Sequence, residues 1–322
     1  MEEDELVDIP FPVWPDEHGQ RIDLFLSRRI KRMSRSKAAD LIRDGKVRRQ
    51  SGPLDRPSLK VHAGDRVLLR RKRLSEGPTE DIELPVVFED EYLLAVSKSG
   101  DLVVHPTASA FHRTLIRILR ARRPGEFLDL AHRLDKETSG LILLSRHAAA
   151  DARLKDDFAE RRVKKAYRAI VSGTPAADEF VVDAPMRLAP GSLSGVRMEI
   201  GGADALPSIT RVTVLARGAG VALVEARPET GRQHQIRLHL LHAGLPIVGD
   251  KLYLGGEELF IRSINERLDA ETLTTLVGHP RQALHAFRVD LAHPISRAPI
   301  SISAPLAPDM VELAGRLGLS LG

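Results

Sequence analysis

Two short helices are predicted near the start of the chain, because apolar residues recur there at helical spacing. The first helix carries on one face Ile22, Phe25, Leu26 and Ile30. A second helix begins at an N-cap, Ser34 or Ser36, and ends at Gly45. Its apolar face is formed by Ala38, Leu41 and Ile42.

The residues after this second helix favour a hairpin. Val47 begins an extended segment, and a turn is expected around Ser51-Gly52-Pro53. A strand is predicted over Arg66–Leu69, directly after a turn signal. Residues 20–73 therefore read as a small α/β module. The segment 74–83 is rich in Ser, Gly, Pro and acids and is predicted to be a linker.

From residue 84 onward, short apolar strands recur between helical stretches. The predicted strands are Leu93–Val96, Leu141–Leu144, Tyr167–Val171 and Val221–Glu225. The predicted helices are Thr114–Arg122, His147–Arg161 and Arg232–His242. Because the helices do not alternate strictly with the strands, residues 84–322 are predicted to form an α+β domain on a mostly antiparallel, mixed sheet.

The formal net charge of +4 hides a strong separation of charge along the chain. Residues 1–19 hold seven acids and no Lys or Arg, so they are predicted to be an acidic tail. Residues 20–73 hold eighteen Lys or Arg against five Asp, which gives +13. Basic charge at that density favours binding to a polyanion, most simply nucleic acid, over an ordinary surface of mixed charge.

Composition excludes several kinds of chemistry. The chain has no Cys, and therefore no disulfide, thiol nucleophile, iron–sulfur cluster or zinc site that needs sulfur. No apolar run is long enough for a membrane span, and the acidic start differs from a signal peptide. We therefore expect a cytoplasmic, monomeric protein that makes no contact with a membrane.

Three histidines lie close together in one predicted helix: His234, His239 and His242. Their spacings of five and three differ from the i, i+4 pair of a zinc-binding helix, and no acidic residue accompanies them. The chain also has no phosphate loop and no dinucleotide fingerprint. We expect neither a metal site nor a cofactor.

The densest group of polar residues lies within Leu130–Arg146. Polar and charged residues precede Gly140 and an apolar strand, so Asp135 is expected on a loop at the edge of the sheet. An Asp is ionised at neutral pH and can act as a nucleophile or a base. From residue types alone, an Asp that caps a turn or pairs with a neighbouring Arg explains the pattern equally well.

The segment His132–Leu141, with the sequence HRLDKETSGL, resembles the signature of the RluA-type family of RNA pseudouridine synthases. Further blocks that resemble this family follow in the expected order: Val163–Gly173, Arg227–His239, Pro246–Tyr253 and Arg281–Phe287. Where the family commonly has Lys-Pro-x-Gly, this chain has Lys98-Ser99-Gly100 instead. The resemblance covers about residues 84–302.

The resemblance implies a role for four residues. It implies that Asp135 is the essential catalytic residue and that Tyr167 is the active-site tyrosine. It also implies a salt bridge from Arg237 to Asp135. Because a uridine inside folded RNA must be flipped out to react, Arg133 is implied to occupy the vacated space or to hold the displaced phosphate.

These residue types suit the reaction. Pseudouridine forms when the bond from the uracil nitrogen to the sugar breaks and the uracil rejoins through a ring carbon. A carboxylate beside an anomeric carbon serves glycosidases in the same way, and a nearby cation keeps it ionised. A tyrosine ring can stack on the extruded base, and its hydroxyl can accept or donate a proton. The residues leave open whether Asp135 attacks the sugar, attacks the uracil or removes a sugar proton.

The basic segment resembles a ribosomal-protein S-four-type RNA-binding domain, through RIDLFLSRRI, SRSKAADLIRDGKV and VHAGDRVLL. Basic residues in and after the second helix lie away from its apolar side, so they are expected to meet RNA phosphates. These residues are Arg35, Lys37, Arg43 and Lys46.

Together the two resemblances imply an enzyme that isomerises uridine at specific sites in structured RNA, with large-subunit ribosomal RNA favoured over transfer RNA. A non-catalytic RNA-binding or ribosome-assembly factor on the same fold is the main alternative. The presence of Asp135, Tyr167 and Arg237 together favours the enzyme, because a binding protein has no need for all three. A glycoside hydrolase is disfavoured by the few aromatic residues and by the basic module.

Overall fold

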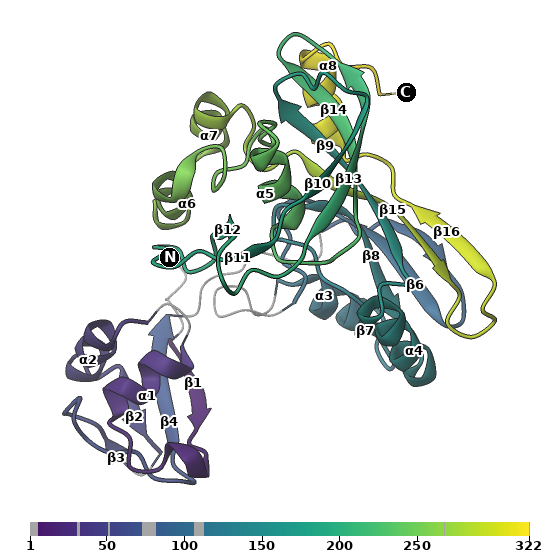
Figure 1. Cartoon of the computed structure of the whole chain (residues 1–322). Helices are drawn as coiled ribbons and strands as arrows, with labels where there is room; N and C mark the ends of the chain where they lie inside the picture. Colours follow the sequence, from purple (N-terminus) through teal and green to yellow (C-terminus); the bar gives the residue numbers. More distant parts are fainter. Residues whose placement is uncertain are drawn as a thin grey trace. The chain divides into compact units, whose positions relative to one another are not determined.

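The computed structural model describes residues 6–30, 33–50, 52–72, 82–105, 113–266 and 268–321. The chain divides into two compact units, residues 1–76 and 77–322 (Figure 1). The predicted linker spans this division, and its residues 74–81 lie outside the described residues. Each unit has its own hydrophobic core.

The N-terminal unit is a four-stranded sheet with two helices. The strand order is β1-β4-β2-β3, with β1 at Leu6–Pro12, β2 at Val47–Arg49, β3 at Gly52–Pro53 and β4 at Arg66–Lys72. Helices α1 (Ile22–Arg29) and α2 (Arg35–Arg43) supply the residues predicted for their apolar faces, and Phe25, Leu26 and Ile42 are fully buried. The Ser34 side chain caps α2 by accepting the N–H of Lys37 at 3.1 Å.

The prediction of an acidic tail over residues 1–19 is wrong for residues 6–19, and residues 1–5 lie outside the described ranges. Residues 6–12 form strand β1, which pairs antiparallel with β4, and residues 15–17 form a short 3-10 helix. The acidic Asp8 accepts hydrogen bonds from Arg48 and Arg70 of the other strands in this sheet. Charge composition indicated a tail, but here opposite charges within one sheet hold the segment in place.

The second unit is built on one large sheet with the order β10-β13-β14-β9-β15-β8-β6-β5. Strand β16 pairs with β15, β7 pairs with β8, and β11 and β12 form a separate hairpin. The strands are β5 (Val86–Glu89), β6 (Leu93–Lys98), β7 (Asp129–Leu130), β8 (Ser139–Ser145), β9 (Lys164–Ser172), β10 (Glu179–Asp183), β11 (Met186–Leu188), β12 (Met198–Ile200), β13 (Ile209–Arg217), β14 (Val221–Pro228), β15 (Leu284–Ala292) and β16 (Pro299–Ser303). The predicted α+β class and mostly antiparallel sheet are confirmed, with β8 and β15 as a parallel pair.

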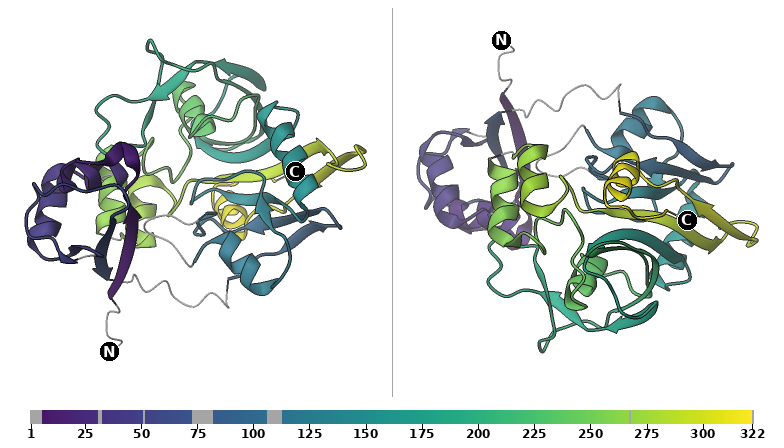
Figure 2. Two further views of the ribbon diagram at one scale, coloured as in Figure 1. Left: turned by 90° about the horizontal axis from the view of Figure 1, so that it is seen from below. Right: turned by 90° about the horizontal axis from the view of Figure 1, so that it is seen from above.

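Six helices of the described residues accompany this sheet: α3 (Leu115–Arg122), α4 (Ala148–Ala159), α5 (Gln235–His242), α6 (Gly256–Asn265), α7 (Ala270–Val277) and α8 (Pro308–Arg316). One core packs α3 and α4 against β6 and β8, and a second packs α5 and α8 against β9 and β14. Figure 2 shows the strands of the second half curving around α5. Tyr167 of β9 contacts both cores. No helix in the described ranges is long and apolar enough to cross a membrane.

The predicted helix over Arg232–His242 begins three residues later than expected. Residue His234 has a φ of +56°, in the left-handed region, so the helix starts at Gln235. The side-chain oxygen of Gln235 accepts hydrogen bonds from the hydroxyl of Thr230 and from the N–H of Arg232. These bonds hold residues 230–234 in a loop where the first helical turn was expected. Gln233 therefore lies before the helix.

The parallel contact of β8 with β15 depends on one glycine. Gly140 pairs with Ala286 and has a φ of +105°, a conformation that side chains other than glycine rarely adopt. A Cβ atom at Gly140 would lie 2.3 Å from the carbonyl oxygen of Ala286. The close approach of these strands places the loop before β8 beside the first residues of β15.

We expect Gly140→Ala to lower the free energy of unfolding by about 3 kcal/mol or more, because the new methyl group must push two paired backbones apart. Thermal unfolding of the full chain measures this loss. Gly125→Ala is the matched control, since Gly125 also has a positive φ but has open space at the Cβ position. Equal stability losses in the two variants would show that the positive φ alone accounts for the cost of Gly140→Ala, without a contribution from the close approach of the strands.

Candidate active site

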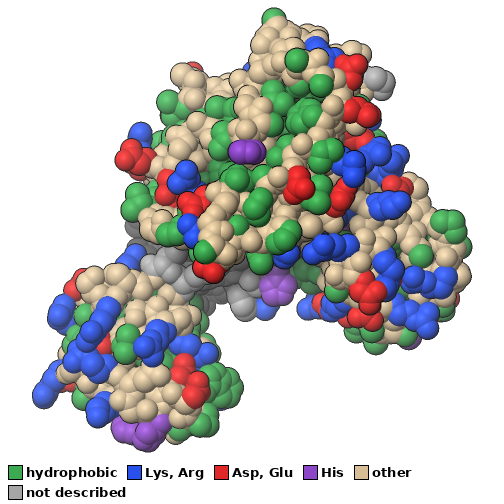
Figure 3. Space-filling view, in the orientation of Figure 1, with side chains coloured by type: hydrophobic (Ala, Val, Ile, Leu, Met, Phe, Trp, Pro, Cys, Tyr) green, Lys and Arg blue, Asp and Glu red, His purple; other side chains and the backbone are tan. Residues whose placement is uncertain are grey.

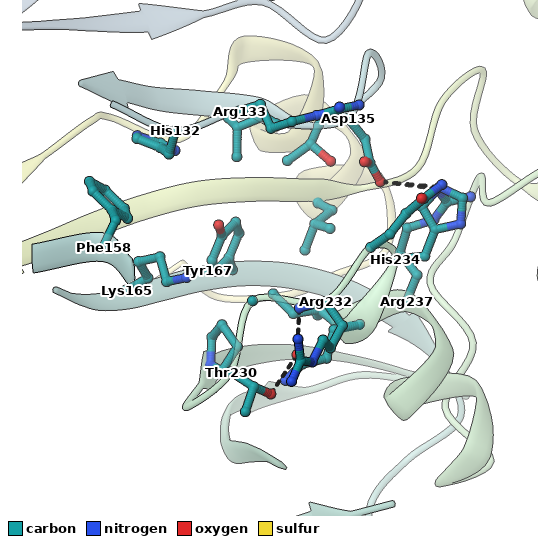
Figure 4. Close-up of a pocket in the computed structure, with 18 of the residues that line it drawn as sticks. His132, Arg133, Asp135, Phe158, Lys165, Tyr167, Thr230, Arg232, His234 and Arg237 are labelled. Atoms are coloured by element: carbon teal, nitrogen blue, oxygen red, sulfur yellow. Dashed lines mark hydrogen bonds and ion pairs between the residues drawn. The ribbon is translucent and has the colours of Figure 1, made fainter. Parts of the chain in front are cut away.

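A cavity of about 490 Å³ is lined by residues of both large cores of the second unit, among them Leu134 and Ile236. Its walls come from the loop before β8, from β9 and from the segment that leads into α5 (Figure 4). Asp135, Tyr167, Arg237 and Arg133 all line it. Residues as far apart in the sequence as Asp135 and Arg237 are thus brought together, as the resemblance implied.

Each of the three residues after Asp135 accepts a hydrogen bond from a side chain that is distant in the sequence. The buried Lys98 ammonium donates to the carbonyl oxygen of Lys136 at 2.8 Å. Arg281 donates to the carbonyl oxygen of Glu137 at 3.0 Å, and Gln282 donates to the Thr138 hydroxyl at 2.7 Å. These contacts fix the loop before any substrate binds, which is the preorganisation that a reactive carboxylate needs.

Lys98 belongs to the turn where the sequence departs from the family pattern. Its Nζ atom also donates to the carbonyl oxygens of Ser99 and Leu102, so the altered turn wraps around a single buried amino group. Burial lowers the pKa of Lys98 to about 7. Gly100 leaves room for Arg281, because a Cβ atom at Gly100 would lie 2.3 Å from that side chain. The turn therefore supports the Asp135 loop without the usual proline.

Arg237 lies between two carboxylates. Its Nη1 atom donates to Oδ2 of Asp135 at 3.2 Å, which confirms the implied salt bridge. Its Nε and Nη2 atoms donate to the two oxygens of Asp250 at 2.6 and 2.8 Å. The Asp250 side chain is 1% exposed and Arg237 is 7% exposed, while Asp135 at 30% remains open to the cavity.

The environment keeps Asp135 ionised. Burial alone would raise the pKa of Asp135, but the charge and hydrogen bond of Arg237 and the charge of Arg133 outweigh burial and hold this pKa below its usual value. Arg237 remains charged, since its pKa is raised by the two carboxylates despite the cost of burial. Among the described residues, hydrogen bonds reach only the Oδ2 atom of Asp135, so Oδ1 has no protein donor there.

His234 is a neutral neighbour of this ion pair. Burial, with the Arg237 charge, lowers the pKa of His234 to about 4. The Tyr253 hydroxyl accepts the N–H of Met198 at 3.0 Å and lies 3.1 Å from Nδ1 of His234. A Tyr253 hydroxyl that donates to Nδ1 leaves the His234 proton on Nε2, which lies 3.8 Å from the Asp135 carboxylate.

Tyr167 and Lys165 project into the cavity from the same face of β9. Burial and the charge of Asp135 raise the pKa of Tyr167, so the hydroxyl is protonated at neutral pH. Burial lowers the pKa of Lys165. The ring of Tyr167 is placed to stack on a planar base, because it forms part of the cavity wall next to the Asp135 loop.

Arg133 and His132 differ in exposure. Arg133 is exposed at the cavity wall, and its guanidinium has no hydrogen bond within the described parts of the chain. His132 accepts the N–H of Leu143 at 3.1 Å and stacks on Phe158. Burial lowers the pKa of His132 to about 3, so this histidine is neutral and supports the wall of the cavity.

The three histidines considered for a metal do not meet. His239 is buried, and its two ring nitrogens contact the Thr210 hydroxyl and the Ala184 carbonyl oxygen. His242 is exposed on the outer side of α5, while His234 faces Asp135. Within the described ranges, no group of three His, Asp or Glu side chains is arranged to hold a metal ion.

The basic candidates of the N-terminal unit are exposed, and three of them have acidic neighbours. Arg35 lies 3.0 Å from the buried Asp23, so its head group is ion-paired with α1 while its side chain remains exposed. Arg43 and Lys46 pair with neighbouring acids in the same unit. Lys37 is exposed on α2. Figure 3 shows many further Lys and Arg side chains on the visible face of this unit.

Sequence reasoning missed Asp250, His234 and Tyr253 as site residues. Asp250 and Tyr253 stood in a block that resembled the family, but neither spacing nor composition assigned them a contact. Asp250 is fully buried and also accepts the N–H groups of Leu252 and Tyr253, so its place depends on how the loop after α5 folds back. The available signal was a charged pair, Asp250 and Lys251, within an otherwise apolar block.

Family comparisons cover both units. Residues 92–242 match the RNA pseudouridylate synthase family, and residues 20–67 match the S4 domain. The second match includes both helices of the N-terminal unit, and the first includes Asp135, Tyr167 and Arg237.

Curated relatives align along nearly the whole chain. Ribosomal large subunit pseudouridine synthase C of Pasteurella multocida is 35% identical over 313 residues, which cover 94% of this chain and 91% of that protein. Ribosomal large subunit pseudouridine synthase D of Pseudomonas aeruginosa is 33% identical, with 93% and 92% covered.

Solved structures agree with the sequence matches. Human RNA pseudouridylate synthase domain containing 4 is 26% identical with a TM-score of 0.58, and the match covers 73% of this chain and 94% of that one. Human RNA pseudouridylate synthase domain containing 1 is also 26% identical, with a TM-score of 0.56 and with 76% and 98% covered. With its carboxylate, tyrosine and arginine gathered in one cavity, the chain belongs to the RluA-type family of RNA pseudouridine synthases and carries an S4 domain.

Proposed function

We propose that this isomerase converts uridine to pseudouridine in large-subunit ribosomal RNA, with Asp135 as the catalytic carboxylate, and that it acts in the cytoplasm as a monomer. The observation that carries the chemistry is the Asp135 carboxylate, ion-paired with Arg237 and open to a cavity that Tyr167 also lines. The choice of RNA is supported by the names of the curated relatives and by the S4 domain. Transfer RNA is the alternative substrate.

The reaction needs no external reagent. The bond between uracil N1 and the sugar C1′ breaks, a bond from C5 to C1′ forms, and the proton lost from C5 is balanced by one gained at N1. Asp135 assists the change at C1′ or at the uracil as an ionised group, and Arg237 keeps that charge available. Tyr167 stacks on the uracil while it turns, and its protonated hydroxyl can take part in the proton movement.

Access of the uridine to the cavity requires that it leave the RNA helix. Arg133 precedes Asp135 by two residues and is exposed at the wall of the same cavity. A guanidinium at that place can enter the gap in the RNA or bind the phosphate of the flipped nucleotide. We assign Arg133 to this step and not to the bond exchange.

Asp135→Asn preserves size but removes the negative charge. We expect turnover of uridine in rRNA to fall by at least about 10³-fold, with fold and RNA affinity nearly unchanged, because Arg237 retains Asp250 as a partner. Single-turnover kinetics and thermal unfolding measure the two effects. Turnover near the wild-type rate would remove Asp135 from the mechanism.

Arg237→Met tests the partner of this carboxylate. We expect a strong loss of turnover and a stability loss of about 3–5 kcal/mol, because the buried Asp250 is left unpaired. Single-turnover kinetics and thermal unfolding again report the two changes. Combined with Asp135→Asn, the loss of turnover should be far from additive, since both changes disable one unit. Additive losses of turnover would show that Asp135 and Arg237 act independently.

The N-terminal unit should contribute affinity. Lys37→Gln and Lys46→Gln are each expected to reduce the slope of log K against log salt by about 0.7–0.9, the value for one RNA phosphate that the lysine no longer neutralises. The rate at saturating RNA should stay unchanged. Arg262→Gln on α6 is the control, because it removes the same charge from an exposed i, i+4 pair in the other unit. An unchanged salt slope in both lysine variants would exclude these lysines from the RNA interface.

The substrate is identified by mapping pseudouridine in cells that lack the gene. We expect one or more sites in large-subunit rRNA to lose the modification and to regain it when the wild-type gene, but not the Asp135→Asn form, is restored. If rRNA is unchanged and a transfer RNA loses a mark, the enzyme acts on transfer RNA. If both kinds of RNA keep every mark, the non-catalytic alternative is favoured.

A further inference from the structure

A second, smaller cavity of about 210 Å³ adjoins the active-site cavity. The two share Phe158, Lys165, Thr230, Gly231 and Arg232 as lining residues. Figure 4 shows Lys165 and Phe158 at the end of the active-site cavity away from Asp135. The smaller cavity therefore extends the active-site cavity on the side away from Asp135. A nucleotide next to the reacting uridine can lie there.

Three cations line this second cavity: Arg161, Lys165 and Arg232. None of their side chains has a hydrogen bond or carboxylate partner within the described residues, and the Nε atom of Arg232 is buried without a partner. The acidic residue of the wall, Glu229, pairs with Arg211 at 2.6 Å. Three unpaired cations around a small cavity favour an anion as the occupant.

Arg161 adds an independent observation, because its backbone is strained. Helix α4 ends at Ala159, and Arg161 has a φ of +59°. The N–H of Arg161 donates to the Phe158 carbonyl and that of Arg162 donates to the Asp157 carbonyl, the pattern in which glycine is the usual residue at the left-handed position. Arginine at this position carries backbone strain that glycine would avoid, and this outlier directs attention to its side chain, which lines the second cavity.

We propose that Arg161, Lys165 and Arg232 form a subsite for a backbone phosphate of a nucleotide next to the target uridine. The inference rests on the proposed function, since RNA is the source of the phosphate. A phosphate there would neutralise the cations and supply acceptors for the buried Nε atom of Arg232. The subsite would fix the RNA strand beyond the flipped base, so it sets affinity and position and takes no part in the bond exchange.

Arg161→Gly is the sharpest test, because Arg161 lines the second cavity and does not line the first. We expect KM and the dissociation constant for a modified rRNA fragment to rise about tenfold, with kcat unchanged and a smaller salt slope. The melting temperature should stay the same or rise, because glycine relieves the strained backbone. A purely structural arginine would instead give a lower melting temperature with unchanged RNA affinity, which would overturn the proposal.

Arg153→Gln, on helix α4, is the control. Arg153 donates to the carbonyl oxygen of Pro294 and lines neither cavity. We expect this variant to bind the fragment as the wild type does. If it weakens RNA binding as much as Arg161→Gly, general charge explains the effect and the subsite is rejected.

A single methylphosphonate linkage in the RNA identifies the phosphate. The linkage is placed in turn on each side of the target uridine. At one of these positions it should weaken binding to the wild type about tenfold, and at that position it should cause no further loss of binding to Arg161→Gly. Equal losses with both proteins at every position would overturn the subsite. If the wild type modifies no rRNA fragment, the proposed function fails instead, so the two failures are distinguishable.

Discussion

The buried guanidinium of Arg237, held between Asp250 and Asp135, is the interaction on which the active site depends. Removing two carboxylates and a guanidinium from water is costly, and the cost is offset only when every charge has close partners. Asp250 has them all: two bonds from Arg237 and two backbone N–H groups. Asp135 receives one bond and stays partly exposed, so the inner carboxylate anchors the arginine and the outer one remains available for chemistry.

This ion pair works only if the Asp135 loop stays in place, and contacts from distant parts of the chain hold it. Lys98 binds the loop backbone from the end of β6, and Arg281 binds it from the segment before β15. Arg281 is in turn paired with Asp309 at the start of α8. The loop is therefore fixed by strands and a helix of both cores, which explains why the site lies where those cores meet.

Because His234 is neutral, it leaves the ion pair between Arg237 and Asp135 undisturbed. A protonated imidazole would compete with Arg237 for Asp135, but burial and the guanidinium charge oppose protonation. The Tyr253 hydroxyl contacts Nδ1 of this imidazole and accepts the N–H of Met198. The hairpin β11–β12 thus reaches the site through the N–H of Met198, although it contributes no side chain to the cavity lining.

By itself, the sequence determined the elements with strong periodicity and the residues of the signature. The helices around Phe25 and Ala38 and the strands around Leu143 and Val224 were predicted from local spacing. The gathering of Asp135, Tyr167 and Arg237 was implied by the resemblance of the motifs to a known family, and all three residues line one cavity. Strand β1 was missed, since its acidic and proline residues stabilise a strand only when β4 and its arginines lie beside it. Asp250, the left-handed start of α5 and the cavity around Arg161 were likewise decided by the tertiary structure. Each depends on charges and backbone groups that are distant in the sequence, and only folding brings these within the few ångströms over which a hydrogen bond acts.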